Sequence, residues 1–143
     1  MTMRRVLSIL LVCFLAAACR EPLSTERFVT GDGPYVFSFQ LEEGASYDFD
    51  FYTRVDARHY GLSPVAELPL DVSWTSPSGT TLKERVYLPL SGFSSRFSRQ
   101  VCHPYRAGVR PREYGRWTVS VAATDTIPHT GLGLVVRKTP DAL

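Results

Sequence analysis

The chain has 143 residues, of which 44% are hydrophobic and 21% are charged. These proportions are typical of one globular domain and exclude a disordered or fibrous protein. The formal net charge is only +2, which gives no reason to expect nucleic-acid binding. Eight Phe, seven Tyr, ten Gly and ten Pro favour a β protein that is rich in turns.

The N-terminus has the three parts of a bacterial secretory signal. Arg4 and Arg5 form a basic region, residues 6–15 are an apolar run, and residues 16–18 are alanines. The apolar run is too short to cross a bilayer core of about 30 Å as a stable helix. We therefore expect residues 1–18 to act as an export signal that is removed.

The residues before Cys19 indicate the type of signal. Residues 15–19, LAAAC, resemble the lipobox of bacterial lipoproteins. The resemblance implies that the Cys19 thiol is diacylated and becomes the new N-terminus, and several acyl chains hold a protein firmly at a membrane. Arg20 follows, where aspartate would favour inner-membrane retention in some bacteria, so we expect anchoring in the outer membrane, facing the periplasm. The alternative is ordinary cleavage after Ala18, which leaves Cys19 unmodified.

Cysteine usage agrees with this interpretation. With Cys13 in the signal and Cys19 acylated, Cys102 is alone in the mature domain, so an intramolecular disulfide is excluded. Residues 20–27 are polar, and we expect residues 19–27 to be the lipidated N-terminus and a tether. Stability must then come from a hydrophobic core within residues 28–143, which are enough to build one.

Beyond the tether, apolar and polar residues alternate with the period of β-strands, and no long helical period appears. We expect strands within residues 35–41, 47–55, 66–74, 82–90, 93–105, 117–121 and 132–136. In the second of these, alternation leaves Asp48, Asp50 and Arg54 outside. Seven or eight antiparallel strands with one apolar face each must bury those faces against another sheet. The prediction is an all-β single domain, a two-sheet antiparallel β-sandwich of jelly-roll or immunoglobulin-like type.

The turn at residues 76–80, SPSGT, allows a test of register. Both flanking strands put even-numbered residues inward, so facing positions must have an even sum. A three-residue loop meets this condition and pairs Trp74 with Leu82. It also places Glu84 opposite position 72 on the inner face, where a carboxylate needs a sheet margin or an arginine partner.

Two prolines restrict where their strands can lie. Pro69 and Pro89 fall within expected strands. Because proline lacks the N–H that a ladder needs, we expect these strands to be sheet edges or to be bulged at the proline.

Charge is distributed unevenly along the chain. Residues 20–75 carry ten acidic and four basic side chains, whereas residues 76–143 carry ten basic and four acidic ones. Six arginines lie close together: Arg96, Arg99, Arg106, Arg110, Arg112 and Arg116. The planar fork of arginine suits phosphate and carboxylate groups, so Arg106, Arg110 and Arg112 are candidate partner-binding residues. The favoured alternative is that these arginines pair with acids on neighbouring strands or form a solvated face.

Residues 57–65 offer His59 and Tyr60 as a second candidate binding rim, although such loops more often only connect strands. Signs of catalysis or metal binding are weak. No HExxH or paired-cysteine motif is present, and the acids do not supply the roughly six to eight oxygens that calcium needs. Cys102 and His103 are adjacent, so in a strand they point to opposite faces and cannot form a nucleophile–base pair. We predict no catalytic residue, no metal site and no cofactor.

The order of these segments resembles the gliding motility lipoprotein GldH family. The likeness covers the lipobox, the aromatic strand at 35–41, the SPSG turn, YGRWTV at 114–119 and IPHTGLGL at 127–134. It implies a non-enzymatic envelope lipoprotein that acts with gliding machinery and its linked secretion system and docks on other envelope proteins. A narrower resemblance, through SPSGT and GRWTV, is to the P domain of subtilisin-like convertases, which implies a jelly roll.

A carbohydrate- or peptidoglycan-binding β-sandwich module is the alternative function. Such a module would present aromatic side chains on one sheet face or on the rim. An exposed flat row of tyrosines or tryptophans would therefore favour it, and a closed core that holds Trp74 and Trp117 would not. An enzyme with an unrecognised site would instead need a deep cleft with clustered titratable groups.

Overall fold

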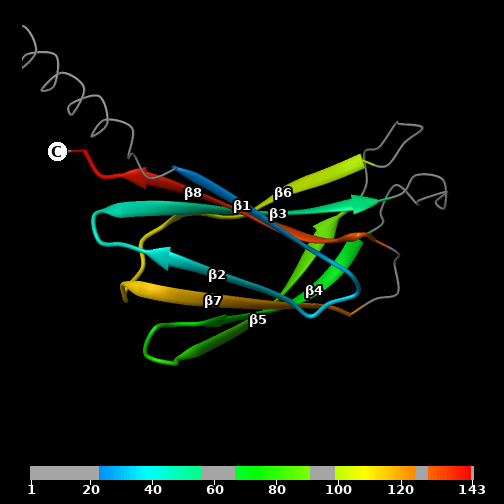
Figure 1. Cartoon of the computed structure of the whole chain (residues 1–143), viewed down its shortest axis with the longest axis horizontal. Helices are drawn as coiled ribbons and strands as arrows, with labels where there is room; N and C mark the ends of the chain where they lie inside the picture. The colour runs from blue at the N-terminus through cyan, green and yellow to red at the C-terminus, as the bar shows by residue number, and fades with distance from the viewer. Residues whose placement is uncertain (1–22, 56–66, 91–98, 125–128, 143) are drawn as a thin grey trace, which may run out of the picture.

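The computed structural model describes residues 23–55, 67–90, 99–124 and 129–142. These residues form eight strands: β1 (Ser24–Thr30), β2 (Tyr35–Leu41), β3 (Ala45–Val55), β4 (Glu67–Thr75), β5 (Thr81–Pro89), β6 (Arg99–Val109), β7 (Gly115–Ala123) and β8 (Gly131–Pro140). They make two antiparallel four-stranded sheets with strand orders β1-β8-β3-β6 and β2-β7-β4-β5, which are stacked as two layers (Figure 1). The predicted all-β sandwich is confirmed.

The strand pairing is nested. β1 pairs with β8, β2 with β7, β3 with β6, and β4 with β5. A chain that pairs its two ends and continues inward to a central hairpin is one long hairpin rolled onto itself. The additional pairs β3–β8 and β4–β7 complete the two sheets. This arrangement is a jelly roll, which the sequence alone could not distinguish from an immunoglobulin-like sandwich.

The hydrophobic core fills the space between the two layers. Its largest side chains are those that alternation placed inward, among them Tyr35, Phe37, Phe49, Phe51, Leu70 and Trp74. The ring of Phe49 lies 5.0 Å from that of Trp74 and 5.4 Å from that of Phe39, measured between centroids. Phe49 belongs to one sheet and the other two rings to the opposite sheet, so one edge-to-face contact, with Trp74, and one tilted contact, with Phe39, join the two layers.

The β4–β5 hairpin has the predicted register, with Trp74 opposite Leu82 and Val72 opposite Glu84. Two backbone hydrogen bonds of 2.9 Å close its turn, and Gly79 takes the left-handed φ of +88° that this loop needs. Leu82 differs from expectation because it is 58% exposed. β5 is the last strand of its sheet, so a side chain near its end has neighbours on one side only.

The folded domain begins earlier than the composition suggested. Ser24 already pairs with Arg137 of β8, so residues 24–27 belong to the sheet and not to a tether. β1 is an edge strand whose first four residues are exposed, and its backbone pairing therefore does not require an alternating apolar pattern. Among the described residues, no helix is long and apolar enough to cross a membrane.

The two strand prolines have different surroundings. Pro89 lies in β5, an edge strand, as predicted. Pro69 lies in β4, which is an inner strand, so the expectation of an edge is wrong for it. The ladder between β4 and β7 ends at Leu70, and the Pro69 carbonyl accepts a hydrogen bond of 3.1 Å from the Thr124 amide. The missing N–H of Pro69 therefore falls where the ladder has already ended.

Candidate functional site

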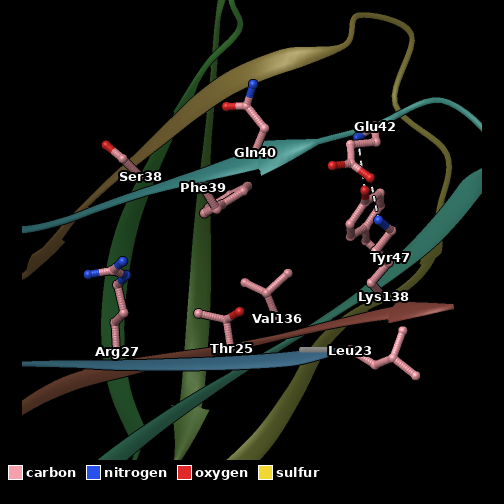
Figure 2. Close-up of a pocket in the computed structure, with 10 residues that line it drawn as sticks. All are labelled: Leu23, Thr25, Arg27, Ser38, Phe39, Gln40, Glu42, Tyr47, Val136 and Lys138. Atoms are coloured by element: carbon pink, nitrogen blue, oxygen red, sulfur yellow. Dashed lines mark hydrogen bonds and ion pairs between the residues drawn. The ribbon is translucent and has the colours of Figure 1, made fainter. Parts of the chain in front are cut away.

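An open groove lies between the edge strands β1 and β2, at the side where the two layers part (Figure 2). Its volume is about 340 Å³. Phe39 of β2 and Val136 of β8 point into it from opposite sheets, and Arg27 rises beside them from β1. The groove therefore combines an apolar floor with a polar rim.

The rim of this groove is partly neutralised. Lys138 of β8 forms an ion pair with Glu42, and the Glu42 amide donates a hydrogen bond of 2.8 Å to the Tyr47 hydroxyl. Arg27 forms no ion pair with any described residue and stays a solvated cation at the mouth. The groove has no signal in the sequence, because its lining joins the first three strands to the distant strand β8.

The opposite side of the sandwich is closed by a network between β5 and β6. The Tyr105 hydroxyl donates a hydrogen bond to Glu84 and accepts one of 2.8 Å from Trp74 Nε1. Arg106 Nη2 contacts the two carboxylate oxygens of Glu84 at 2.8 and 2.7 Å. Burial raises the pKa of Glu84, but the hydrogen bonds from Arg106 and Tyr105 outweigh it and lower that pKa overall. Glu84 therefore lies on an edge strand and has an arginine partner, the two conditions expected for a carboxylate at this inward-facing position.

The three candidate arginines, Arg106, Arg110 and Arg112, differ in their contacts. Arg106 is held by Glu84, and the guanidinium of Arg110 makes a bidentate pair with Asp141 at 3.0 and 2.8 Å. Arg112 is exposed and forms no ion pair within the described residues. The favoured alternative, pairing with acids on neighbouring elements, therefore applies to two of the three candidates. Binding of a partner by any of them stays a prediction.

Several predicted functional residues lie outside the described residues. Cys19, His59 and Tyr60 are among them, and so is Arg96. Their predicted roles stay predictions. Within the described ranges, no group of three or more His, Cys, Asp or Glu side chains could hold a metal ion.

Of the two tryptophans that a carbohydrate-binding face could use, Trp74 is buried in the core and Trp117 is partly buried against it. Trp74 is 7% exposed, and Trp117 packs against the core while its Nε1 donates a hydrogen bond of 3.0 Å to the Glu113 carbonyl. Tyr87 and Tyr114 are exposed, but they lie on β5 and in the turn before β7. Two tyrosines on different elements do not make the flat row that this function would need.

Cys102 lies beside Asp50 on the sheet made of β1, β8, β3 and β6. Asp50, expected outside, is only 6% exposed because β3 is an inner strand. It lies between Arg137 Nη1 of β8, at 2.5 Å, and Cys102 Sγ of β6, at 3.9 Å. Burial and the Asp50 carboxylate raise the pKa of the Cys102 thiol. A raised pKa reduces the reactive thiolate, so this site does not have the character of a nucleophile.

Comparison with known proteins does not place the chain in a family: no protein-family model matches it, and no curated protein matches it. The resemblance to the gliding motility lipoproteins therefore stays a prediction from the sequence. The function has to be argued from the N-terminal signal and from the surfaces of the sandwich.

Proposed function

We propose that this chain is a lipid-anchored protein of the bacterial cell envelope, held in the outer membrane, facing the periplasm and acting as a non-enzymatic interaction component. The observation that carries this proposal is the LAAAC segment at residues 15–19, behind a basic region and an apolar run. A resemblance to gliding-motility and secretion-associated lipoproteins supports the same role.

The position of the first strand fits an anchored domain. β1 begins at Ser24, so only residues 20–23 separate it from Cys19. Four extended residues span at most about 14 Å. Acyl chains on Cys19 would therefore hold the sandwich next to the lipid headgroups and keep its surfaces available to neighbouring envelope proteins.

The surface features of the sandwich support docking more than they support sugar binding. The groove between β1 and β2 is open and lined by mixed polar and apolar groups. The core location of Trp74 and Trp117 gives no support to an aromatic carbohydrate-binding face. We therefore propose proteins of the envelope as the partners, with no nucleic acid among them.

Lipidation can be tested by growing the bacterium with an alkyne-bearing palmitate. We expect label on the wild-type chain and none on Cys19→Ser, because the thioether cannot form without the thiol. Cys102→Ser is the matched control and should keep full label, since its thiol lies on the folded domain. Label that persists in Cys19→Ser, or an unmodified Cys19 in the N-terminal peptide by mass spectrometry, would contradict the anchor.

The role in the envelope can be tested by deleting the gene in a gliding host. We expect reduced surface motility and reduced secretion, restored by the wild-type gene and not by Cys19→Ser. The second complementation separates the need for the domain from the need for its anchor. Motility and secretion that both stay at wild-type rates in the deletion strain would count against the proposed role.

A further inference from the structure

Among the strands that the structure describes, four lie at sheet edges, and they are not equally protected against pairing with another strand. β5 carries Pro89 and β6 carries Pro104, and the ladder between β3 and β6 has register shifts. The two strands are also tied to each other by Tyr105 and Glu84. Prolines, irregular ladders and inward-pointing charges are devices that prevent edge-to-edge association.

β2 has none of these devices. Its seven residues, YVFSFQL, include no proline and no charge. It pairs only with β7 among the described strands, and its outward side chains are exposed, with Val36 54% accessible. An uncharged edge strand with three aromatic residues and a valine is a template on which another strand can pair.

We infer that a second copy of this chain pairs with β2, antiparallel and centred on Ser38. Facing residues must share a sheet face, so their positions must have an even sum. Centring on Ser38 satisfies this rule and uses all seven residues of β2. It sets Ser38 opposite Ser38 of the second copy and Val36 opposite Gln40, all of them exposed side chains on the outer face, and such directly opposed pairs stabilise a sheet.

The charges around the groove favour β2 over β1 as the self-pairing edge. Self-pairing of β1 centred on Arg27 would oppose two guanidinium groups, and centring it on Glu26 would oppose two carboxylates. Like charges that face each other across strands are destabilising. Self-pairing of β2 opposes no charges at all.

The resulting interface is isologous and closed by a two-fold axis. It joins two four-stranded sheets into one continuous eight-stranded sheet with β2 of each copy at the centre. This inference goes beyond the proposed anchoring and does not depend on it, because the residues involved all lie in the folded domain.

A designed disulfide tests the register. In the full chain carrying Cys13→Ser, Cys19→Ser and Cys102→Ser, the further change Ser38→Cys introduces a single thiol. Directly opposed residues in an antiparallel pair have Cα atoms about 4.5–5.5 Å apart, within the span of a disulfide. Mild oxidation should convert most of the protein to a covalent dimer. Ser73→Cys, on the same outer face but on inner strand β4, is the matched control and should form no disulfide-linked dimer, because its thiol lies away from the two-fold axis. Equal cross-linking at both positions, or none at position 38, overturns the inference.

A charge introduced at the same position tests the pairing without a cross-link. The wild-type chain in mild detergent should have the protein mass of a dimer by light scattering. Ser38→Lys should raise the dissociation constant at least about tenfold, because two ammonium groups would then face each other. Ser73→Lys should leave the dimer intact, and circular dichroism should show both variants folded. A wild-type chain that stays monomeric at protein concentrations up to about 0.1 mM, where even a dimer with a dissociation constant in the micromolar range would form, overturns the inference. A dimer whose dissociation constant is unchanged by Ser38→Lys overturns it as well.

Discussion

Replacing Gly133 by alanine is expected to lower the free energy of unfolding by about 3 kcal/mol, the upper range for forcing extra atoms into a packed site. Gly133 lies directly opposite Tyr52 in the β3–β8 ladder. A Cβ atom at Gly133 would lie 2.1 Å from two carbons of the Tyr52 ring. An aromatic ring laid over a cross-strand glycine is a known way of stabilising a sheet at a position without a side chain.

The Tyr52 ring cannot easily move away from an added methyl group. The Phe28 ring of β1, which is also directly opposite Gly133, is stacked with it at a centroid distance of 5.5 Å. The Arg54 guanidinium lies 4.7 Å from the Phe28 ring centroid in turn. Tyr52 is fully buried although it points to the outer face of its sheet, so relief of the clash requires three side chains to move together.

Two variants separate this clash from a general intolerance of alanine. Gly44→Ala has no atom within 4 Å of its Cβ but a φ of +76°, and should cost only about 1 kcal/mol. In a Tyr52→Ala background the cost of Gly133→Ala should fall by about 2 kcal/mol, the coupling expected of touching residues. Urea denaturation followed by circular dichroism measures all of these. A cost of Gly133→Ala that is the same in both backgrounds would show that the ring is not the cause.

The change Tyr105→Phe is expected to lower the free energy of unfolding by about 2 kcal/mol at neutral pH. The lost hydroxyl accepts from Trp74 Nε1 and donates to Glu84. Its removal leaves a largely buried indole donor and a partly buried carboxylate without one partner each. Tyr114→Phe is the matched control: Tyr114 is exposed and forms no hydrogen bond within the described residues, so we expect a change within about 0.5 kcal/mol.

At acidic pH, Tyr105→Phe should lower the free energy of unfolding by less than it does at neutral pH. Hydrogen bonds from Arg106 and Tyr105 overcome the effect of burial and hold the folded-state pKa of Glu84 below its ordinary value of 4.5. A lowered carboxyl pKa contributes stability that is present above the unfolded-state pKa and is lost as the pH falls through the folded-state pKa. The difference between wild type and Tyr105→Phe should therefore shrink as the pH falls below 4.5. An undiminished difference at the acid end would mean that Tyr105 acts through packing and not through the carboxylate.

Much of the local structure follows from residue order alone. Alternation in residues 35–41 and 47–55 identifies the inward faces of β2 and β3, because successive side chains of a strand point to opposite sides. The SPSGT turn determines the β4–β5 register, because loop length and side-chain parity must agree. Only a positive φ at Gly79 makes that loop possible. The export signal and the expectation of lipid on Cys19 are also sequence inferences.

The candidate groove could not be predicted in the same way. Its lining comes from β1, β2, β3 and β8, and no pattern in any one segment indicates that these strands meet. The sequence placed residues 24–27 in a tether because their side chains are polar. In the structure, backbone pairing with β8 makes them an edge strand, and this strand forms one wall of the groove.

Alternation along each strand assigns the inward-facing side, because that assignment depends only on the two-residue period of the strand. Which strands lie side by side is visible in the folded chain alone. An apolar sheet face can cover any other apolar face, so alternation cannot choose between a jelly roll and an immunoglobulin-like sandwich. The nested pairing, from β1 with β8 to β4 with β5, also brings Tyr105 to Glu84 and leaves Asp50 enclosed on an outer face. Among the described strands it pairs β2 with β7 alone. These outcomes depend on long-range backbone pairing, which is settled only when the whole chain closes.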